Sequence, residues 1–455
     1  MKFLLFSQFL FFFSAIGLGQ VTNRPISPDT SNKTILELPS PFPSFPSPPF
    51  PMSDWAGGAI IGEASGDSPD FLMKAILKMS KKSWPKWHEL GIKAYGWIDV
   101  SMNGSTSKQT NSPMSYDLVP NRPELDQAIL RIERVPDIGQ RKHIDWGFLS
   151  DNIFGIDYRY TIAKGIVSDQ LLKHNNLYGF DPTQLYGLLY IPNVAQGMLV
   201  KVGRFISPAD IEAQWAPDNY LFSHSLMFSV DPYTFTGMNT TIRLQRRIQI
   251  ELGVHAGNDM APWSNSAQIN GLAMIRWVSK NNRQSLYGGI NSLGNGQYEN
   301  GHDDLQMVSG VWGCKFTEKI HMMTEAYYIW QSNAALGGTA IYGPAQYGQG
   351  GGMGSIIPGI SKAIGLVNYF QILCSPKDYI SIRNDALNDI NGNRTGYSTW
   401  YTSHTVGFSH HFSNYLITRP EIRYEQAWNN HNVTPYDMGT KKSQFTGAVD
   451  LVIRF

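Results

Sequence analysis

The sequence predicts an all-β protein, a transmembrane antiparallel up-and-down β-barrel of about 16 strands. Segments whose residues alternate between apolar and polar recur from residue 91 to the last residue. Their connections alternate between long and short, as in outer-membrane barrels. Past residue 20 the chain has no uninterrupted apolar run of the roughly 18 residues that a spanning helix needs. Together with a mean hydropathy of −0.24, this excludes a helical membrane protein.

The clearest alternation is in the last strand, Gln444 to Phe455. A period of two gives a strand two different faces, here one apolar and one mixed. An isolated strand of a soluble sandwich shows the same pattern, but the pattern recurs upstream and the chain stops on an aromatic residue. We expect the apolar face to be the assembly signal read by the barrel-assembly machinery. Its residues are Phe445, Leu451, Ile453 and Phe455.

Composition narrows the class of partner. The chain of 455 residues has 37 Lys and Arg against 36 Asp and Glu, so charge gives no reason to expect nucleic acid binding. Aromatic residues at 13% and 43 glycines suit strands, turns and interfacial rings. Cys314 and Cys374 are too few for a disulfide scaffold or a cysteine metal site, and their spacing leaves open whether they pair.

The N-terminal residues predict export to the bacterial outer membrane. Residues 1–19 have a basic Lys2, an apolar core, and small residues before Gln20, as in a cleaved signal peptide. An uncleaved anchor helix is the alternative. Residues 20–67 form a Pro-rich periplasmic linker, because proline fixes φ and lacks the amide donor. The linker is a stiff spacer or docks its phenylalanines on a partner.

A short basic amphipathic helix and an aromatic anchor are expected over residues 68–88. Ser68, Pro69 and Asp70 suit a helix start. The helix would lie on the membrane, plug the pore or pack on the barrel mouth, and the sequence does not choose. Trp84 and Trp87 then precede the barrel of residues 91–455, as expected at a headgroup boundary.

Sixteen strands are expected in that barrel, with those from 184, 284 and 377 the least regular. They start near residues 91, 125, 143, 184, 197, 235, 246, 270, 284, 306, 319, 363, 377, 401, 416 and 444. Both chain ends then fall on the side of the short turns, which we assign to the periplasm. Side chains cannot fill a barrel of this width, so it encloses an aqueous channel.

Several short segments resemble the OmpL-like β-barrel porin family (porin-2 type). They include Gly96–Asp99, Leu125–Glu133, Asp145–Gly147, Phe154–Arg159, Val200–Phe205, Phe222–Ser225 and Asp231–Gly237. Their order and spacing carry the resemblance, which covers about a third of the chain. It implies an outer-membrane barrel and a porin, and no residue-level mechanism.

A candidate site lies in the third long connection. Residues 205–242 contain no Lys or Arg but hold Asp210, Glu212, Asp218 and Asp231. We expect this segment to enter the channel and face basic wall residues, so that opposed charges tune ion selectivity. An ordinary external loop over the mouth is the alternative. Further lining candidates are Arg131, Glu133, Arg247, Glu251, Arg383, Arg419, Glu421, Arg423 and Glu425.

No cofactor, metal or catalytic residue is expected. His302, Asp303 and Asp304 supply too few oxygens for Ca²⁺, and the segment from Asp389 has Arg394 where a calcium loop requires Gly. The Gly-rich loop 337–354 covers the barrel or binds a surface ligand.

The predicted function is passive diffusion of small hydrophilic solutes or ions through a polar lumen in outer-membrane lipid. A structural or adhesive barrel with a closed lumen, and an outer-membrane hydrolase, are the alternatives. Whether the protein is a homo-oligomer stays open.

Overall fold

The computed structural model describes residues 61, 89–113, 116–166, 177–299, 303–337, 354–428 and 433–455. All of them belong to the compact unit Leu36–Phe455. Apart from Ile61, the predicted signal peptide, linker and basic helix lie outside the described residues. Within these ranges, no helix has the length and apolar content needed to cross a membrane.

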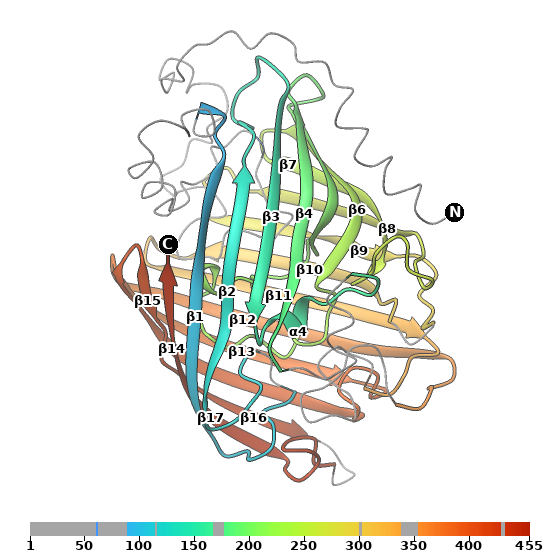
Figure 1. Ribbon diagram of the computed structural model, residues 1–455, viewed down its shortest axis with the longest axis vertical. Helices are drawn as coiled ribbons and strands as arrows, with labels where there is room; N and C mark the ends of the chain where they lie inside the picture. Colours follow the sequence, from blue (N-terminus) through green and yellow to red (C-terminus); the bar gives the residue numbers. More distant parts are fainter. Residues whose placement is uncertain are drawn as a thin grey trace. The chain divides into compact units, whose positions relative to one another are not determined.

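Seventeen strand segments form one antiparallel sheet in the described chain (Figure 1). They are Lys93–Ser105 (β1), Pro123–Arg134 (β2), Asp145–Gly155 (β3), Gly179–Ile191 (β4), Met198–Ile206 (β5), Thr234–Gln245 (β6), Ile248–Asn258 (β7), Asn270–Val278 (β8), Gln284–Leu293 (β9), Gln306–Lys315 (β10), Ile320–Ser332 (β11), Ile360–Ser375 (β12), Asp378–Asp389 (β13), Thr399–Ser413 (β14), Leu416–Thr418 (β15), Glu421–Trp428 (β16) and Ser443–Arg454 (β17). Two short helices, Tyr158–Thr161 (α4) and the 3-10 turn Ala216–Asp218 (η2), lie in connections.

The sheet closes on itself. Each strand pairs with its neighbours in sequence, and β17 pairs with β1 from Trp97↔Arg454 to Ser105↔Thr446. Strand β15 and strand β16 both pair with β14 and with β17, so they are two pieces of one strand. Pro420 lies in the gap between them, because proline has no amide hydrogen for the ladder. The fold is therefore the predicted barrel, with sixteen strands and one of them interrupted.

Connections alternate in length around the barrel, as predicted. The turn from β6 to β7 holds only Arg246 and Arg247, and the turn from β12 to β13 only Pro376 and Lys377. On the other end the connections are long, for example residues 106–122 and 207–233. Both chain ends of the barrel lie on the short-turn side, and Figure 1 marks the C-terminus beside β1.

Outward and inward side chains alternate along most strands. In β14, Trp400, Val406 and Phe408 are exposed, whereas their neighbours Tyr401 and Thr405 are buried. A mostly apolar outer surface around a closed sheet matches a lipid-facing wall. The C-terminal strand follows the same rule, since Phe445 and Ile453 are exposed on its apolar face.

The interior differs from the expected polar lumen. One side of the inner wall, on strands β8 to β12, is mostly apolar and buried. Its side chains include Leu272, Met274, Tyr287, Met307, Val311, Met323, Ile329 and Val367. They pack with apolar residues of the connection 207–233, including Leu226, Met227 and Val230, which explains why the wall is apolar there.

Ile61 lies at the short-turn end of the barrel. Its side chain is fully buried in a cluster with Ile138, Tyr190 and Leu199. Its main-chain nitrogen donates to Oε1 of Gln249 at 2.7 Å, and its main-chain oxygen accepts from Arg243. This residue of the N-terminal extension is therefore held against the inner side of β6 and β7.

Candidate functional site

The connection between β5 and β6, residues 207–233, runs through the inside of the barrel. We call it the lumen loop. Trp215, Ser225 and Leu226 in it are fully buried, and it bonds to strands that lie far from β5 and β6 around the sheet. A loop that covered the mouth from outside would leave these groups exposed, so the lumen loop fills part of the interior.

Carboxylates of the wall hold the main chain of the lumen loop. Glu325 of β11 accepts from the amides of Asp210 (3.1 Å) and Ile211 (2.9 Å). Further around the barrel, Glu421 of β16 accepts from the amides of Phe222 (2.9 Å) and Ser223 (3.2 Å). These carboxylates satisfy amides that would otherwise be buried without a partner, which would cost roughly 1–3 kcal/mol each.

Arginines of the wall bind carbonyl groups of the same loop. Arg419 donates to the carbonyl oxygens of Ala216 (2.6 Å) and Asn219 (2.9 Å). Arg423 donates to the carbonyl oxygen of His224 at 2.6 Å. Both guanidinium groups are buried under the loop. The arginines therefore fix the path of the loop and do not face it across open water.

One charged pair joins a loop side chain to the wall. Nη1 of Arg383 lies 3.2 Å from Oε1 of Glu212, and the same guanidinium donates to Oγ of Ser223 at 3.0 Å and to its carbonyl oxygen. Arg383 is fully buried. A buried ion pair with this many hydrogen bonds fixes one geometry, because breaking it would leave a charge without a partner.

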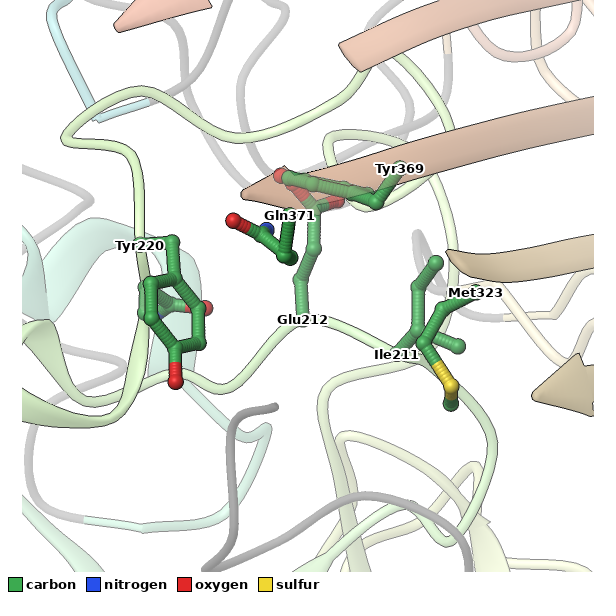
Figure 2. A pocket seen from close by; sticks show the side chains of 7 residues that line it. Ile211, Glu212, Tyr220, Met323, Tyr369 and Gln371 are labelled. Carbon is green, nitrogen blue, oxygen red and sulfur yellow. The ribbon is translucent and has the colours of Figure 1, made fainter. Parts of the chain in front are cut away.

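A small pocket lies between the lumen loop and strands β11 and β12 (Figure 2). Figure 2 shows Glu212 with its carboxylate beside the hydroxyl of Tyr369, and Tyr220 on the opposite side. Tyr369 donates to Glu212. The pocket is lined by Ile211, Glu212, Asn219, Tyr220, Met323, Tyr369 and Gln371. Its surface mixes aromatic rings, amides and one carboxylate.

Four further wall residues that were predicted to line the channel also face inward, and each has a partner. Arg131 makes two parallel bonds to Asp151, at 2.7 and 2.6 Å. Glu133 accepts from the hydroxyl of Tyr95 at 2.8 Å. Further pairs are Glu251 with the hydroxyl of Tyr287 (2.8 Å) and Glu425 with Nη2 of Arg423 (2.8 Å).

Other predicted residues lie elsewhere than expected. Arg247 lies in the two-residue turn between β6 and β7, outside any strand, so strand parity does not aim it inward. Asp210 lies beside Asp231 and no base, and burial together with the charge of Asp231 raises the pKa of Asp210. Asp218 is half-buried in the 3-10 turn, and its charge acts on Arg454 at the end of β17.

A group of inward carboxyl groups was missed from sequence. Asp99 of β1 and Glu124 and Asp126 of β2 are buried inside the barrel. A β-bulge opposite Asp99 and Val100 places both Asp126 and Gln127 inward, which breaks the period of two. Strict alternation therefore gives the wrong face for residues on one side of the bulge.

The described residues contain no group of three or more His, Cys, Asp or Glu that could hold a metal ion. His302 lies outside them. Asp303 pairs with Arg394 at 2.9 Å, and Asp304 accepts from Asn270 at 2.8 Å, so both have protein partners. Cys314 is buried and Cys374 exposed, and the two thiols are free, which answers the question of their pairing.

A family model described as "Putative beta-barrel porin-2, OmpL-like" matches residues 91–455. The chain belongs to this porin family. No curated protein matches the chain. The resemblance seen in the first half of the barrel thus extends to the whole of it.

Solved structures of bacterial outer-membrane proteins resemble this porin. An anion-selective porin from Comamonas acidovorans superposes with a TM-score of 0.50 at 11% identity, over 80% of this chain and 99% of that one. The outer membrane channel DcaP of Acinetobacter baumannii has a TM-score of 0.48 at 9% identity, over 80% and 97%. At 11% identity, the likeness to the first of these structures shows only that the two proteins share a fold. The protein is an outer-membrane channel of the porin class.

Proposed function

We propose that this porin passes small hydrophilic solutes and ions by passive diffusion, without enzymatic activity, and that the lumen loop forms its constriction. The observation that carries the proposal is the double attachment of the loop. Wall carboxylates hold its amides and wall arginines hold its carbonyls, at distances of 2.6–3.2 Å. A loop fixed in this way narrows the lumen to a defined path, so solute size is limited by a rigid segment.

The charge inside the barrel supports a preference for cations. Among the described residues, buried carboxyl groups outnumber buried Arg and Lys side chains by about two to one. Most of the arginines are already bound to loop carbonyls or to carboxylates, as Arg131 is to Asp151. Charged rings and patches that line a pore select ions of opposite sign. Excess carboxylate therefore favours cations, in contrast to the anion-selective porin of similar fold.

The pocket beside Glu212 is our candidate for the narrow part of the path. It is bounded by the lumen loop on one side and by β11 and β12 on the other. Glu212 contributes a carboxylate there, and its ion pair with Arg383 holds it in place. A solute that passes would meet the rings of Tyr220 and Tyr369 and the amide of Gln371.

Planar-bilayer recordings of the purified porin test this function. In a KCl gradient we expect a reversal potential of the sign that indicates cation preference. The triple variant Asp210→Asn, Glu212→Gln, Asp218→Asn should lower the K⁺ over Cl⁻ permeability ratio by about twofold or more, because it removes loop carboxylates. A barrel that does not conduct, or a variant with unchanged conductance and selectivity, would contradict the proposal.

Glu318→Gln is the matched control. Glu318 lies in the exposed short turn between β10 and β11, away from the lumen loop. The substitution removes one carboxylate from the same chain and leaves the interior unchanged. Its conductance and reversal potential should equal those of the unchanged porin.

A further inference from the structure

The outer face of strands β11 to β14 carries a row of polar side chains where the rest of the outer wall is mostly apolar. Thr324 is opposite Asn368, Asn368 is opposite Asn384, and Asn384 is opposite His404. Each belongs to the outward parity of its strand, since the neighbours Val367, Arg383 and Thr405 are buried inside. Four adjacent strands therefore present one continuous polar row.

The His404 end of the row lies at mid-depth of the membrane band. On β14, the outward aromatic residues Trp400 and Phe408 stand four residues on either side of His404, and aromatic residues gather at the two membrane interfaces. Four residues of a tilted strand rise roughly 10 Å. The imidazole of His404 is therefore placed in the middle of the hydrocarbon layer.

Hydrogen bonds within the row satisfy only part of its polar groups. Nδ2 of Asn368 donates to Oγ1 of Thr324 at 2.7 Å, and Nδ1 of His404 lies 2.7 Å from Oδ1 of Asn384. If Nδ1 carries the hydrogen, the neutral ring still offers Nε2 as an acceptor and Asn384 still offers two amide hydrogens. Acyl chains supply a partner for neither, and unsatisfied polar groups are costly in lipid.

We propose that this row is a contact surface for a second copy of the chain in the membrane. The row holds a free acceptor and free donors side by side, so the same row on another copy supplies a partner for each. Self-complementary surfaces of this kind form symmetric contacts. Apolar outward residues around the row, such as Leu366, Ile382 and Val406, would surround the polar centre with packing.

Two other outer regions show why this face stands out. On β7 the outward residues Ile248, Ile250, Leu252 and Val254 are all aliphatic, as lipid requires. On β3 one outward polar pair occurs, in which Asn152 donates to Ser150 at 3.2 Å. That pair is confined to one strand, so it provides a matched control for an outward asparagine away from the row.

The mass of the full chain in detergent, measured by light scattering during gel filtration, tests the contact. The unchanged porin should have a multiple of the single-chain mass. The double variant Asn384→Val, His404→Leu should be monomeric, a decrease of about twofold or more. Because apolar side chains suit lipid, its thermal midpoint as a monomer should not fall. Asn152→Val should keep the mass of the unchanged porin.

A third variant, His404→Gln, keeps a polar side chain at the same place and should retain the assembled mass. It also tests the contact if the double variant does not fold, because His404→Leu alone can then be compared with it. A monomeric unchanged porin, a complex with a different protein, or equal masses for His404→Leu and His404→Gln would overturn the inference. Conductance per barrel is measured separately, so failure here leaves the channel proposal standing.

Discussion

The two sides of the barrel interior hold the lumen loop by different interactions. On β13 to β17 the wall is charged and binds the main chain of the lumen loop through Arg383, Arg419, Arg423 and Glu421. On β8 to β12 the wall is mostly apolar and packs against Met227 and other apolar side chains of the loop. The lumen loop is thus held mainly by hydrogen bonds on the charged side and mainly by side-chain packing on the other, where Glu325 of β11 also accepts from two loop amides.

This difference shows how an inserted loop can be both stable and exact in position. Apolar contact is non-directional and contributes most of the driving force. Hydrogen bonds to buried charges are directional and costly to break, so they select one register. Substitutions can alter the apolar wall or the charged wall separately. The first kind tests how strongly packing holds the loop, and the second tests what fixes its position.

Removing Arg383 from the charged side should have the largest effect. In Arg383→Met, Glu212 and Asp385 lose the guanidinium that lies 3.2 and 3.4 Å away. Leaving buried carboxylates without that partner should cost roughly 3–5 kcal/mol. We expect a clearly lower thermal midpoint in detergent micelles. Arg246→Met, in the exposed β6–β7 turn, should leave the midpoint unchanged, and equal midpoints for both variants would contradict this view.

Where the loop leaves the lumen, Asp259 makes stability depend on pH. Its carboxylate accepts from the amides of Tyr233 (3.2 Å) and Thr234 (2.7 Å), and burial raises its pKa to about 7. Between the ordinary pKa near 3.8 and about 7, the folded state binds a proton that the unfolded state has lost. The free energy of unfolding should therefore fall as pH rises through this window.

The size of this pH effect is on the order of 1–3 kcal/mol, because Asp259 keeps part of its surface exposed. Other carboxyl groups titrate in the same range, so the measurement is a difference. Thermal midpoints at pH 5 and pH 8 should differ more for the unchanged porin than for Asp259→Asn, which mimics the protonated acid. Equal differences in the two proteins would rule out Asp259 as the source.

Much of this architecture follows from local pattern. Alternation and loop length predict sixteen strands, and β8, β9 and β10 begin at the predicted residues 270, 284 and 306. The pattern predicts that β4 starts at 184, whereas the strand begins at Gly179. Pro182 and a register shift opposite Asp151 and Ile153 interrupt the alternation there.

The candidate site was less predictable because its contacts join residues far apart in sequence. Acidic composition pointed to the lumen loop, and the structure pairs Glu212 with Arg383, 171 positions later. Yet the loop is held mainly through its main-chain amides and carbonyls, which nearly every residue has and which composition does not reveal. The apolar inner wall was missed for a related reason. In the sequence, Leu272 and Met307 are apolar residues on a face that should be polar, and only their contacts with the loop explain them.

Substitution of a glycine on the apolar side should give the smallest effect of these variants. Gly365 of β12 points inward, and a Cβ there would lie 2.5 Å from Cγ of Met227 and 2.9 Å from Cε2 of Tyr327. Gly365→Val should therefore push the lumen loop away from this wall at a cost of about 1–3 kcal/mol. The charged side would keep its bonds, so we expect altered single-channel conductance with a small loss of thermal stability.

Gly310→Val separates this effect from the general response of a strand to valine. Gly310 points outward from β10, and a Cβ there would have no heavy atom within 4 Å. Its conductance should equal that of the unchanged porin, because nothing inside the barrel moves. If Gly365→Val also conducts like the unchanged porin, the apolar packing is not what positions the loop, and the charged wall alone sets the constriction.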